Sequence, residues 1–123
     1  MILVDTAIWI DHLHRAEPLL VNLLQDADAC VHPMVVGELA LGSLRNRSGV
    51  LALLGHLPEV PSATHREVLD FVETHGLHGV GLGLVDAHLL AALRLSRTTL
   101  LWTRDRRLRR AAERLEVLAD RLA

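Results

Sequence analysis

The stretch from Leu84 to Leu95 constrains the fold more than any other, because it is apolar on nearly every face and still carries an aspartate. Leucine and alanine favour helix, and a helix that is apolar all round belongs inside a domain. Asp86 then lies near the N-terminus of a buried helix, where an isolated carboxylate is costly. It must become protonated, accept hydrogen bonds from the free backbone N–H groups there, or meet a cation.

Length and composition fit a single domain spanning residues 1–123. A chain of 123 residues that is 50% hydrophobic can bury a real core but does not divide comfortably into two. No segment approaches the roughly 18 apolar residues of a membrane span, and the N-terminus lacks the basic start of a signal peptide. We therefore expect a cytoplasmic protein with no membrane association. Cys30, the single cysteine, lies in an apolar run and is expected to be a buried, inert thiol.

Short aliphatic runs and longer helical patterns alternate along the chain. The strands are expected at 2–4, 29–32, 59–60, 98–103 and 117–118. Helices are expected after Thr6, which could cap the first of them, at 18–24, 34–44, 50–57, 65–75 and 84–95, and through the arginine-rich segment after Asp105. This alternation predicts an α/β fold with a mostly parallel sheet covered by helices on both faces. Ligands bind outside the carboxyl ends of such strands, where Asp5 and Asp105 would lie.

Four acidic residues interrupt or directly follow apolar segments instead of lying on polar faces: Asp5, Glu38, Asp86 and Asp105. Clustered carboxylates repel one another by about 4 kcal/mol per pair at 4 Å and an effective dielectric constant near 20, so a cluster needs compensation. A hard divalent cation prefers oxygen ligands, and Mg²⁺ is commonly held by one or two carboxylates together with water and substrate phosphates. An acidic pocket without a histidine or cysteine ligand pattern therefore suggests Mg²⁺ or Mn²⁺.

The order and spacing of these acids resemble those of the PIN-domain ribonucleases, and in particular of the VapC-type toxins of bacterial toxin–antitoxin systems. The resemblance spans essentially the whole chain. It rests on Val4-Asp5-Thr6, on Val35-Val36-Gly37-Glu38-Leu39, on Leu84-Val85-Asp86-Ala87 before an alanine- and leucine-rich helix, and on Leu101-Trp102-Thr103-Arg104-Asp105. It implies a three-layer α/β/α sandwich with a central sheet of four to five strands.

The resemblance also implies an activity and a set of site residues. Asp5, Glu38, Asp86 and Asp105 become the catalytic and metal-binding quartet, with Thr6 and Thr103 as hydrogen-bonding support. The implied activity is metal-dependent endoribonuclease cleavage of RNA phosphodiester bonds by the toxin of a type II pair, using one or two ions. The implied partners are a VapB-type antitoxin and a second copy of the chain in a homodimer.

A net charge of −2 hides a basic segment. Six arginines and two acids lie between positions 104 and 114, and every basic residue of the chain is arginine. Arg106, Arg110 and Arg114 recur every four residues, so we expect them, with Arg104, to bind RNA or an acidic partner; a solvated helix face is the simpler alternative. Trp9 and the leucines of the first helices exceed what a small domain can cover, which favours homodimerisation.

Other functions compete with this interpretation. A receiver domain has a similar α/β alternation and an acidic Mg²⁺ pocket, but it requires a lysine, and the chain has none. A haloacid-dehalogenase-like phosphatase would need a second aspartate at position 7, which is alanine. The alternative that stays open is a non-catalytic module whose acidic pocket holds a structural cation or a basic partner peptide. The spacing of His12, His14 and His88 argues against shared metal ligation, since residues two apart on a helix point in different directions.

Overall fold

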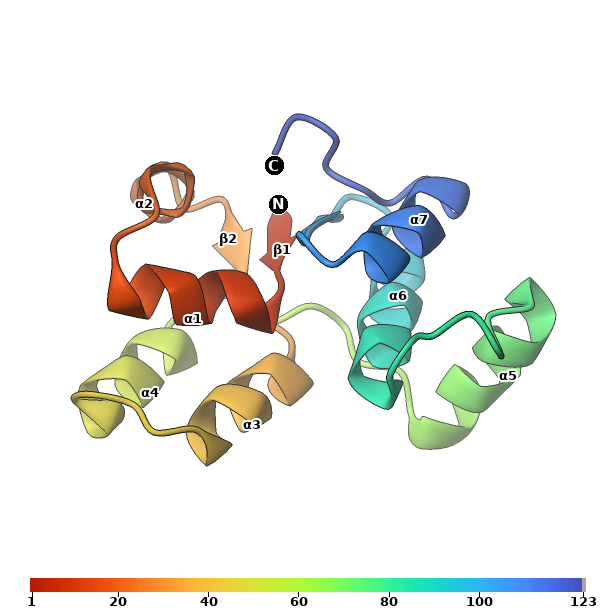
Figure 1. The fold of residues 1–123 in the computed structure, drawn as a ribbon, viewed down its shortest axis with the longest axis horizontal. Helices are drawn as coiled ribbons and strands as arrows, with labels where there is room; N and C mark the ends of the chain where they lie inside the picture. Colours follow the sequence, from red (N-terminus) through yellow and green to blue (C-terminus); the bar gives the residue numbers. More distant parts are fainter. Residues whose placement is uncertain (123) are drawn as a thin grey trace.

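The computed structural model describes residues 1–122 and has an α/β fold (Figure 1). Its strands are β1 (Ile2–Val4), β2 (Ala29–Cys30) and β3 (Leu100–Trp102). Its helices are α1 (Thr6–His14), α2 (Pro18–Gln25), α3 (Pro33–Leu41), α4 (Arg47–Gly55), α5 (His65–His75), α6 (Leu84–Ser96) and α7 (Arg106–Arg114). None of these helices is both long and apolar enough to cross a membrane. The predicted single domain extends to residue 123, which lies outside the described residues.

The three strands form one parallel sheet in the order β2-β1-β3. The register pairs Ile2 with Ala29 on one side of β1 and with Leu100 on the other. β1 is buried along its whole length, as expected for the central strand of a parallel sheet. Helices α1 to α4 lie on one side of the strands and α5 to α7 on the other (Figure 1), so both faces are covered.

The expectation of four to five strands is only partly met. Within residues 1–122 the predicted strands at 59–60 and 117–118 are reduced to single bridges, Val31 to Glu59 and Leu101 to Leu118. Glu59 lies between Pro58 and Pro61, and proline cannot donate a hydrogen bond to a ladder, so pairing ends after one residue. The bridge to Leu118 follows Glu116, whose positive φ of 61° turns the chain sharply out of α7.

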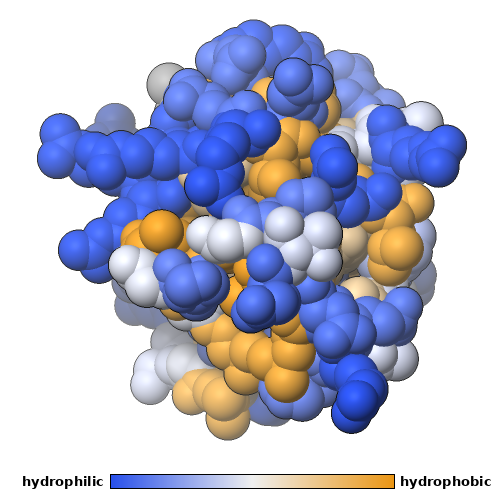
Figure 2. Space-filling view, turned by 90° about the vertical axis from the view of Figure 1, so that its right-hand side faces the viewer, coloured by the Kyte–Doolittle hydropathy of each residue, from blue (hydrophilic) through white to orange (hydrophobic). Residues whose placement is uncertain are grey.

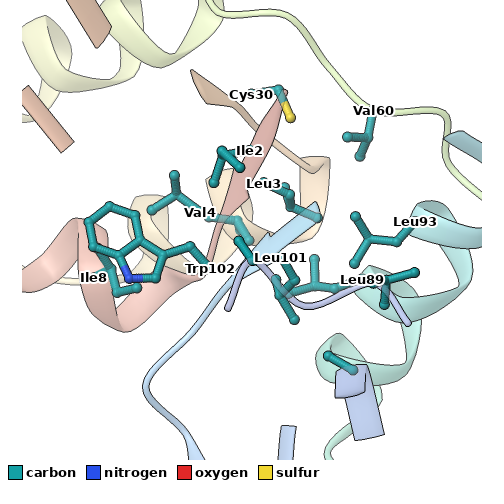
Figure 3. Close-up of a cluster of buried hydrophobic side chains, with 14 of the residues drawn as sticks. Ile2, Leu3, Val4, Ile8, Cys30, Val60, Leu89, Leu93, Leu101 and Trp102 are labelled. Carbon is teal, nitrogen blue, oxygen red and sulfur yellow. The ribbon is translucent and has the colours of Figure 1, made fainter. Parts of the chain in front are cut away.

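The core lies between the sheet and its helices. Leu89 and Leu93 of α6 approach Leu3 of β1 and Leu101 of β3, whereas Ile8 of α1 lies near Trp102 (Figure 3). Cys30 is part of this core, and burial raises the pKa of its thiol to about 11, which confirms that it is inert at neutral pH. Residues 87–93 of α6 are all buried, so this helix is an interior element as its composition predicts.

Three local predictions need correction. Trp9 is only 1% exposed and packs in the core, so it does not contribute to a surface for a second copy of the chain. The exposed apolar residues of the first two helices are instead Ile10, Leu13 and Leu19. Thr6 is the first residue of α1 and not its cap, because Asp5 accepts the capping hydrogen bond. The helix predicted at 34–44 ends at Leu41, before Gly42.

Candidate active site

Asp5 links the central strand to the first helix. Its backbone N–H donates to the carbonyl of Trp102, which continues the pairing of β1 with β3. One carboxylate oxygen, Oδ1, accepts from the backbone N–H of Thr6 at 2.8 Å, and Oδ2 accepts from the hydroxyl of Thr103 at 2.7 Å. The side chain is 9% exposed. The carboxyl edge of the sheet therefore holds Asp5 in one orientation.

Thr103 and Asp105 follow β3 at the same edge. The hydroxyl of Thr103 donates to Asp5 and accepts from the backbone N–H of Asp105 at 3.1 Å, so it joins the two acidic positions. Asp105 is the N-cap of α7, and its Oδ1 accepts from the N–H of Leu108 at 2.9 Å. The guanidinium of Arg109 donates to the backbone carbonyl of Thr103 at 3.1 Å and so stabilises the segment between β3 and α7.

Glu38 reaches the site from α3, which packs against α1. Thr6 donates its hydroxyl to Oε1 of Glu38 at 2.7 Å, so the residue that follows Asp5 orients a second carboxylate. Asp86 lies in the first turn of α6, where its Oδ2 accepts from the N–H of Gly83 at 3.0 Å. Its side chain is half-buried, because the helix is exposed at Leu84 and becomes fully buried only from residue 87.

The charges of neighbouring acids act on the carboxyl groups of Asp5 and Asp86. Burial raises the pKa of Asp5; the hydrogen bonds from Thr103 and Thr6 oppose the rise, and the charges of Glu38 and Asp105 add to it. Burial also raises the pKa of Asp86, the Gly83 hydrogen bond opposes this, and the charges of Asp5, Asp105 and Glu38 add to it. Glu38 and Asp105 are therefore close enough to both Asp5 and Asp86 for their charges to disfavour the ionisation of these two residues.

The donor set fits a hard divalent cation, although its oxygens do not surround a single point. Among residues 1–122, no three carboxylate, imidazole or thiol groups are arranged to hold one ion. In this described part of the chain, Glu38, Asp86 and Asp105 each use one carboxylate oxygen in a hydrogen bond and keep the other without a partner. Since Mg²⁺ needs only one or two protein carboxylates, these free oxygens suit it.

The arginines predicted to bind RNA or a partner occupy different surroundings. Arg104 forms ion pairs with Asp11 at 3.3 Å and Glu17 at 2.8 Å, and its guanidinium lies 5.5 Å from the ring centre of Trp102. It thus links the loop after β3 to α1 through Asp11 and to the start of α2 through Glu17. Arg106, Arg110 and Arg114 lie on the exposed side of α7. A binding role for these four residues stays a prediction.

Sequence reasoning missed His32, which supports the helix that carries Glu38. Its Nδ1 accepts from the N–H of Met34 at 2.9 Å and so caps α3, and its ring lies 6.1 Å from that of His88. Burial, together with the charge of His88, lowers the pKa of His32 to about 4, so the ring is neutral at pH 7. The available signal was a residue able to accept a hydrogen bond directly before a proline at a helix start.

A parallel sheet whose carboxyl edge gathers four carboxylates from β1, α3, α6 and α7 is the arrangement predicted for a nuclease of the PIN type. The PIN domain family model matches residues 2–114, and the chain belongs to this family. It is 50% identical to Ribonuclease VapC32 of Mycobacterium tuberculosis, in strain CDC 1551 / Oshkosh and in strain ATCC 25618 / H37Rv alike. In both comparisons the similarity covers 100% of each chain.

Proposed function

We propose that this protein is a metal-dependent endoribonuclease that hydrolyses RNA phosphodiester bonds and acts as the toxin of a type II toxin–antitoxin pair. The observation that carries the proposal is the cluster of Asp5, Glu38, Asp86 and Asp105, in a chain that belongs to the PIN-domain family and is half-identical to a ribonuclease. Four mutually repelling acids at a ligand-binding sheet edge are costly to maintain without a role in binding a cation.

The proposed cofactor is Mg²⁺ or Mn²⁺, held by the free oxygens of Glu38, Asp86 and Asp105 and by Asp5. Such an ion supplies a more acidic water and neutralises negative charge on the phosphoryl group during in-line attack. The chain's own residues prepare the acids for this role. Thr103 and the N–H of Thr6 favour the ionised form of Asp5, and the hydroxyl of Thr6 orients Glu38.

The proposed partners are RNA, a VapB-type antitoxin and a second copy of the chain. A largely apolar pocket of about 290 Å³ that reaches Glu38 supports the antitoxin; its lining includes Ile10, Leu13, Leu39 and Leu44, together with His14 and Arg45. A partner segment with apolar side chains and one cation could fill this pocket and pair with the acid. Ile10 and Leu13 are each more than one-third exposed, so this surface has apolar area to bury.

The test is cleavage of RNA by the purified protein with Mg²⁺, with Mn²⁺, and with a chelator. We expect cleavage only with the metals, and its loss in Asp86→Asn, which keeps an oxygen to accept the Gly83 hydrogen bond. Asp70→Asn, on the exposed face of α5, removes the same charge away from the site and should cleave as the wild type does. Sequencing the ends of the cut RNA would identify the target. Chelator-insensitive or absent cleavage would favour the non-catalytic module.

A further inference from the structure

A second pocket lies between the loop of residues 76–83 and α7. Its volume is about 240 Å³. It is lined by three apolar residues, Leu77, Val80 and Ala111, and three arginines, Arg107, Arg110 and Arg114. Figure 2 views the side of the molecule that carries α5, α6 and α7, where hydrophobic surface is bordered by hydrophilic side chains. The pocket thus combines apolar surface with several positive charges.

The arginines of this pocket differ from the set that the four-residue spacing predicts. Positions 107 and 114 are seven apart, so on an ideal helix they lie within about 20° of each other, whereas each step from 106 to 110 to 114 drifts by about 40°. The pocket accordingly takes Arg107 together with Arg110 and Arg114, and Arg106 does not line it. Arg107 is two residues from Asp105, so the pocket begins near the end of α7 that Asp105 caps.

One of the three guanidinium groups is held by a hydrogen bond, and a second lies close to the loop. Arg107 lies against Gly81, where a Cβ atom would come within 2.6 Å of its Cδ and 2.8 Å of its Nε. Gly81 has a φ of 85°, so this position favours glycine for its backbone conformation as well as for the close approach. Arg114 donates to the carbonyl of His75 at 2.6 Å. Groups fixed in this way lose less freedom when a ligand binds.

The positive charges of the pocket have no acidic partner. Among residues 1–122, none of Arg107, Arg110 and Arg114 forms an ion pair, and all three are exposed. Three like charges around one pocket repel, and an anion between them relieves that repulsion. The planar guanidinium group matches phosphate oxygens in a bidentate manner. A phosphorylated ligand is therefore favoured over a single carboxylate.

The apolar side of the pocket points to a nucleic-acid strand. Both tryptophans are buried and the chain has no tyrosine, so neither residue type can stack on a base from the surface. A base or ribose would have to pack on aliphatic side chains and on guanidinium planes, which also stack on unpaired bases. Leu77 and Val80 next to Arg107 and Arg110 supply both kinds of contact.

We propose that this pocket binds the single-stranded RNA next to the scissile bond, with a backbone phosphate on Arg107 and Arg110 and a base or ribose against Leu77 and Val80. The proposal rests on the proposed ribonuclease function. Gly81 lies two residues before Gly83, the donor to Asp86, and Arg107 two residues after Asp105. The loop and the helix that form the pocket therefore also contact two of the four acids, Asp86 and Asp105, so that one RNA strand can extend from the pocket toward them.

The test is fluorescence anisotropy of a short labelled single-stranded RNA in EDTA, where metal-dependent cleavage cannot occur. A phosphate contact to a single strand contributes a salt slope of about 0.7, which corresponds to roughly 5-fold in affinity at 0.1 M salt. Arg107→Gln combined with Arg110→Gln should therefore weaken binding by roughly 25-fold and flatten the slope by about 1.4. Arg97→Gln removes a positive charge at the other end of α6 and should change binding less than 2-fold, roughly.

Gly81→Ala provides a second variant with an unchanged net charge, because its methyl group would displace the side chain of Arg107 and strain the loop backbone, where φ is 85°. We expect it to weaken RNA binding roughly as much as the loss of one phosphate contact. Circular dichroism establishes that each variant is folded. Wild-type affinity and slope in the double arginine variant would overturn the proposal, as would equal losses in Arg97→Gln or no RNA binding by the wild type.

This assay is separable from the test of the proposed function. Arginine-dependent binding without metal-dependent cleavage would contradict the nuclease and leave the pocket as an RNA site. Cleavage by a double arginine variant whose RNA affinity and slope are those of the wild type would contradict the pocket and leave the nuclease. If an acidic peptide competes for the pocket while RNA does not bind, a protein partner replaces RNA as its ligand and the proposal fails.

Discussion

Replacing Thr103 by valine tests whether one buried hydroxyl keeps the site ionised. The hydroxyl donates to Oδ2 of Asp5 at 2.7 Å, and it is fully buried. A hydrogen bond to a charged group contributes about 1.5–3 kcal/mol, and Thr103→Val also leaves the N–H of Asp105 without its acceptor. We expect the free energy of unfolding to fall by about 2–3 kcal/mol at pH 7. For a chain of this length, that lowers the Tm by about 8–12 °C.

The pH dependence of the stability loss distinguishes a lost hydrogen bond to ionised Asp5 from a simple packing defect. The bond favours ionised Asp5, so its loss raises the pKa of Asp5 further above the ordinary value. The stability difference between wild type and Thr103→Val should therefore be largest where Asp5 is ionised, and should shrink as the pH falls through its pKa. As the pH is lowered, the nuclease activity of Thr103→Val should decline at a higher pH than that of the wild type, because Asp5 becomes protonated at a higher pH in the variant.

Thr99 offers a matched control, since it is also buried and lies at the other end of β3. Its hydroxyl pairs with that of Ser96 at 2.6 Å, which is a contact between neutral groups. Thr99→Val should cost about 1 kcal/mol with no dependence on the ionisation of an acid. Urea unfolding in EDTA across pH measures both variants. If the cost of Thr103→Val is the same at acidic and neutral pH, the hydroxyl does not stabilise ionised Asp5 and the argument is refuted.

Three further changes have defined outcomes. Burial raises the pKa of Asp86, so without metal the ionised form destabilises the fold as pH rises. Asp86→Asn should therefore unfold at a higher temperature in EDTA, should not be stabilised by Mg²⁺, and should lose activity by at least about 100-fold. A wild-type response to Mg²⁺ would contradict the role of Asp86. Thr6→Val should reduce activity by about 10–100-fold through loss of the hydrogen bond to Glu38, with little change in Tm, whereas full activity would show that this bond is dispensable. His32 has a pKa lowered to about 4, so the free energy of unfolding should fall by up to about 3 kcal/mol as the pH drops from about 6.5 to 4. His32→Asn should lose most of this pH dependence in urea unfolding. An unchanged dependence would show that His32 is not its source.

The positions of the acids along the chain were enough to nominate the candidate site, because each one interrupts or follows an apolar segment; its catalytic role stays a prediction. Asp5 and Asp105 could be placed at the carboxyl edge of the sheet, since both follow strands, and the structure confirms this. Hydrogen-bonding support from Thr6 was expected from the family resemblance, but which acid it would contact was not. A threonine after a strand is a good cap, and only the structure shows that Asp5 takes that position and leaves the hydroxyl for Glu38.

The missed features depend on contacts between segments distant in sequence. The 59–60 and 117–118 runs have the composition of strands, but the turns around them allow only one bridge each. The regular spacing of arginines predicts a row of Arg106, Arg110 and Arg114 on α7. The loop that faces the helix determines which of its residues line the pocket, and these include Arg107. Trp9 was expected to be exposed because the count of apolar residues does not reveal which of them the sheet and α1 cover.

Three helices begin at the acidic cluster, and this has a consequence for its net charge. Asp5 and Asp105 cap α1 and α7, and Asp86 lies in the first turn of α6, so three helices begin at these acids. Each N-terminus is equivalent to about half a positive charge, so together they offset about 1.5 of the four negative charges of the ionised carboxylates. A single divalent ion would then bring the centre close to neutral. A second divalent ion would make the centre positive and able to attract a phosphodiester. The helix N-termini therefore help to determine how many bound ions are needed before the centre attracts RNA instead of repelling it.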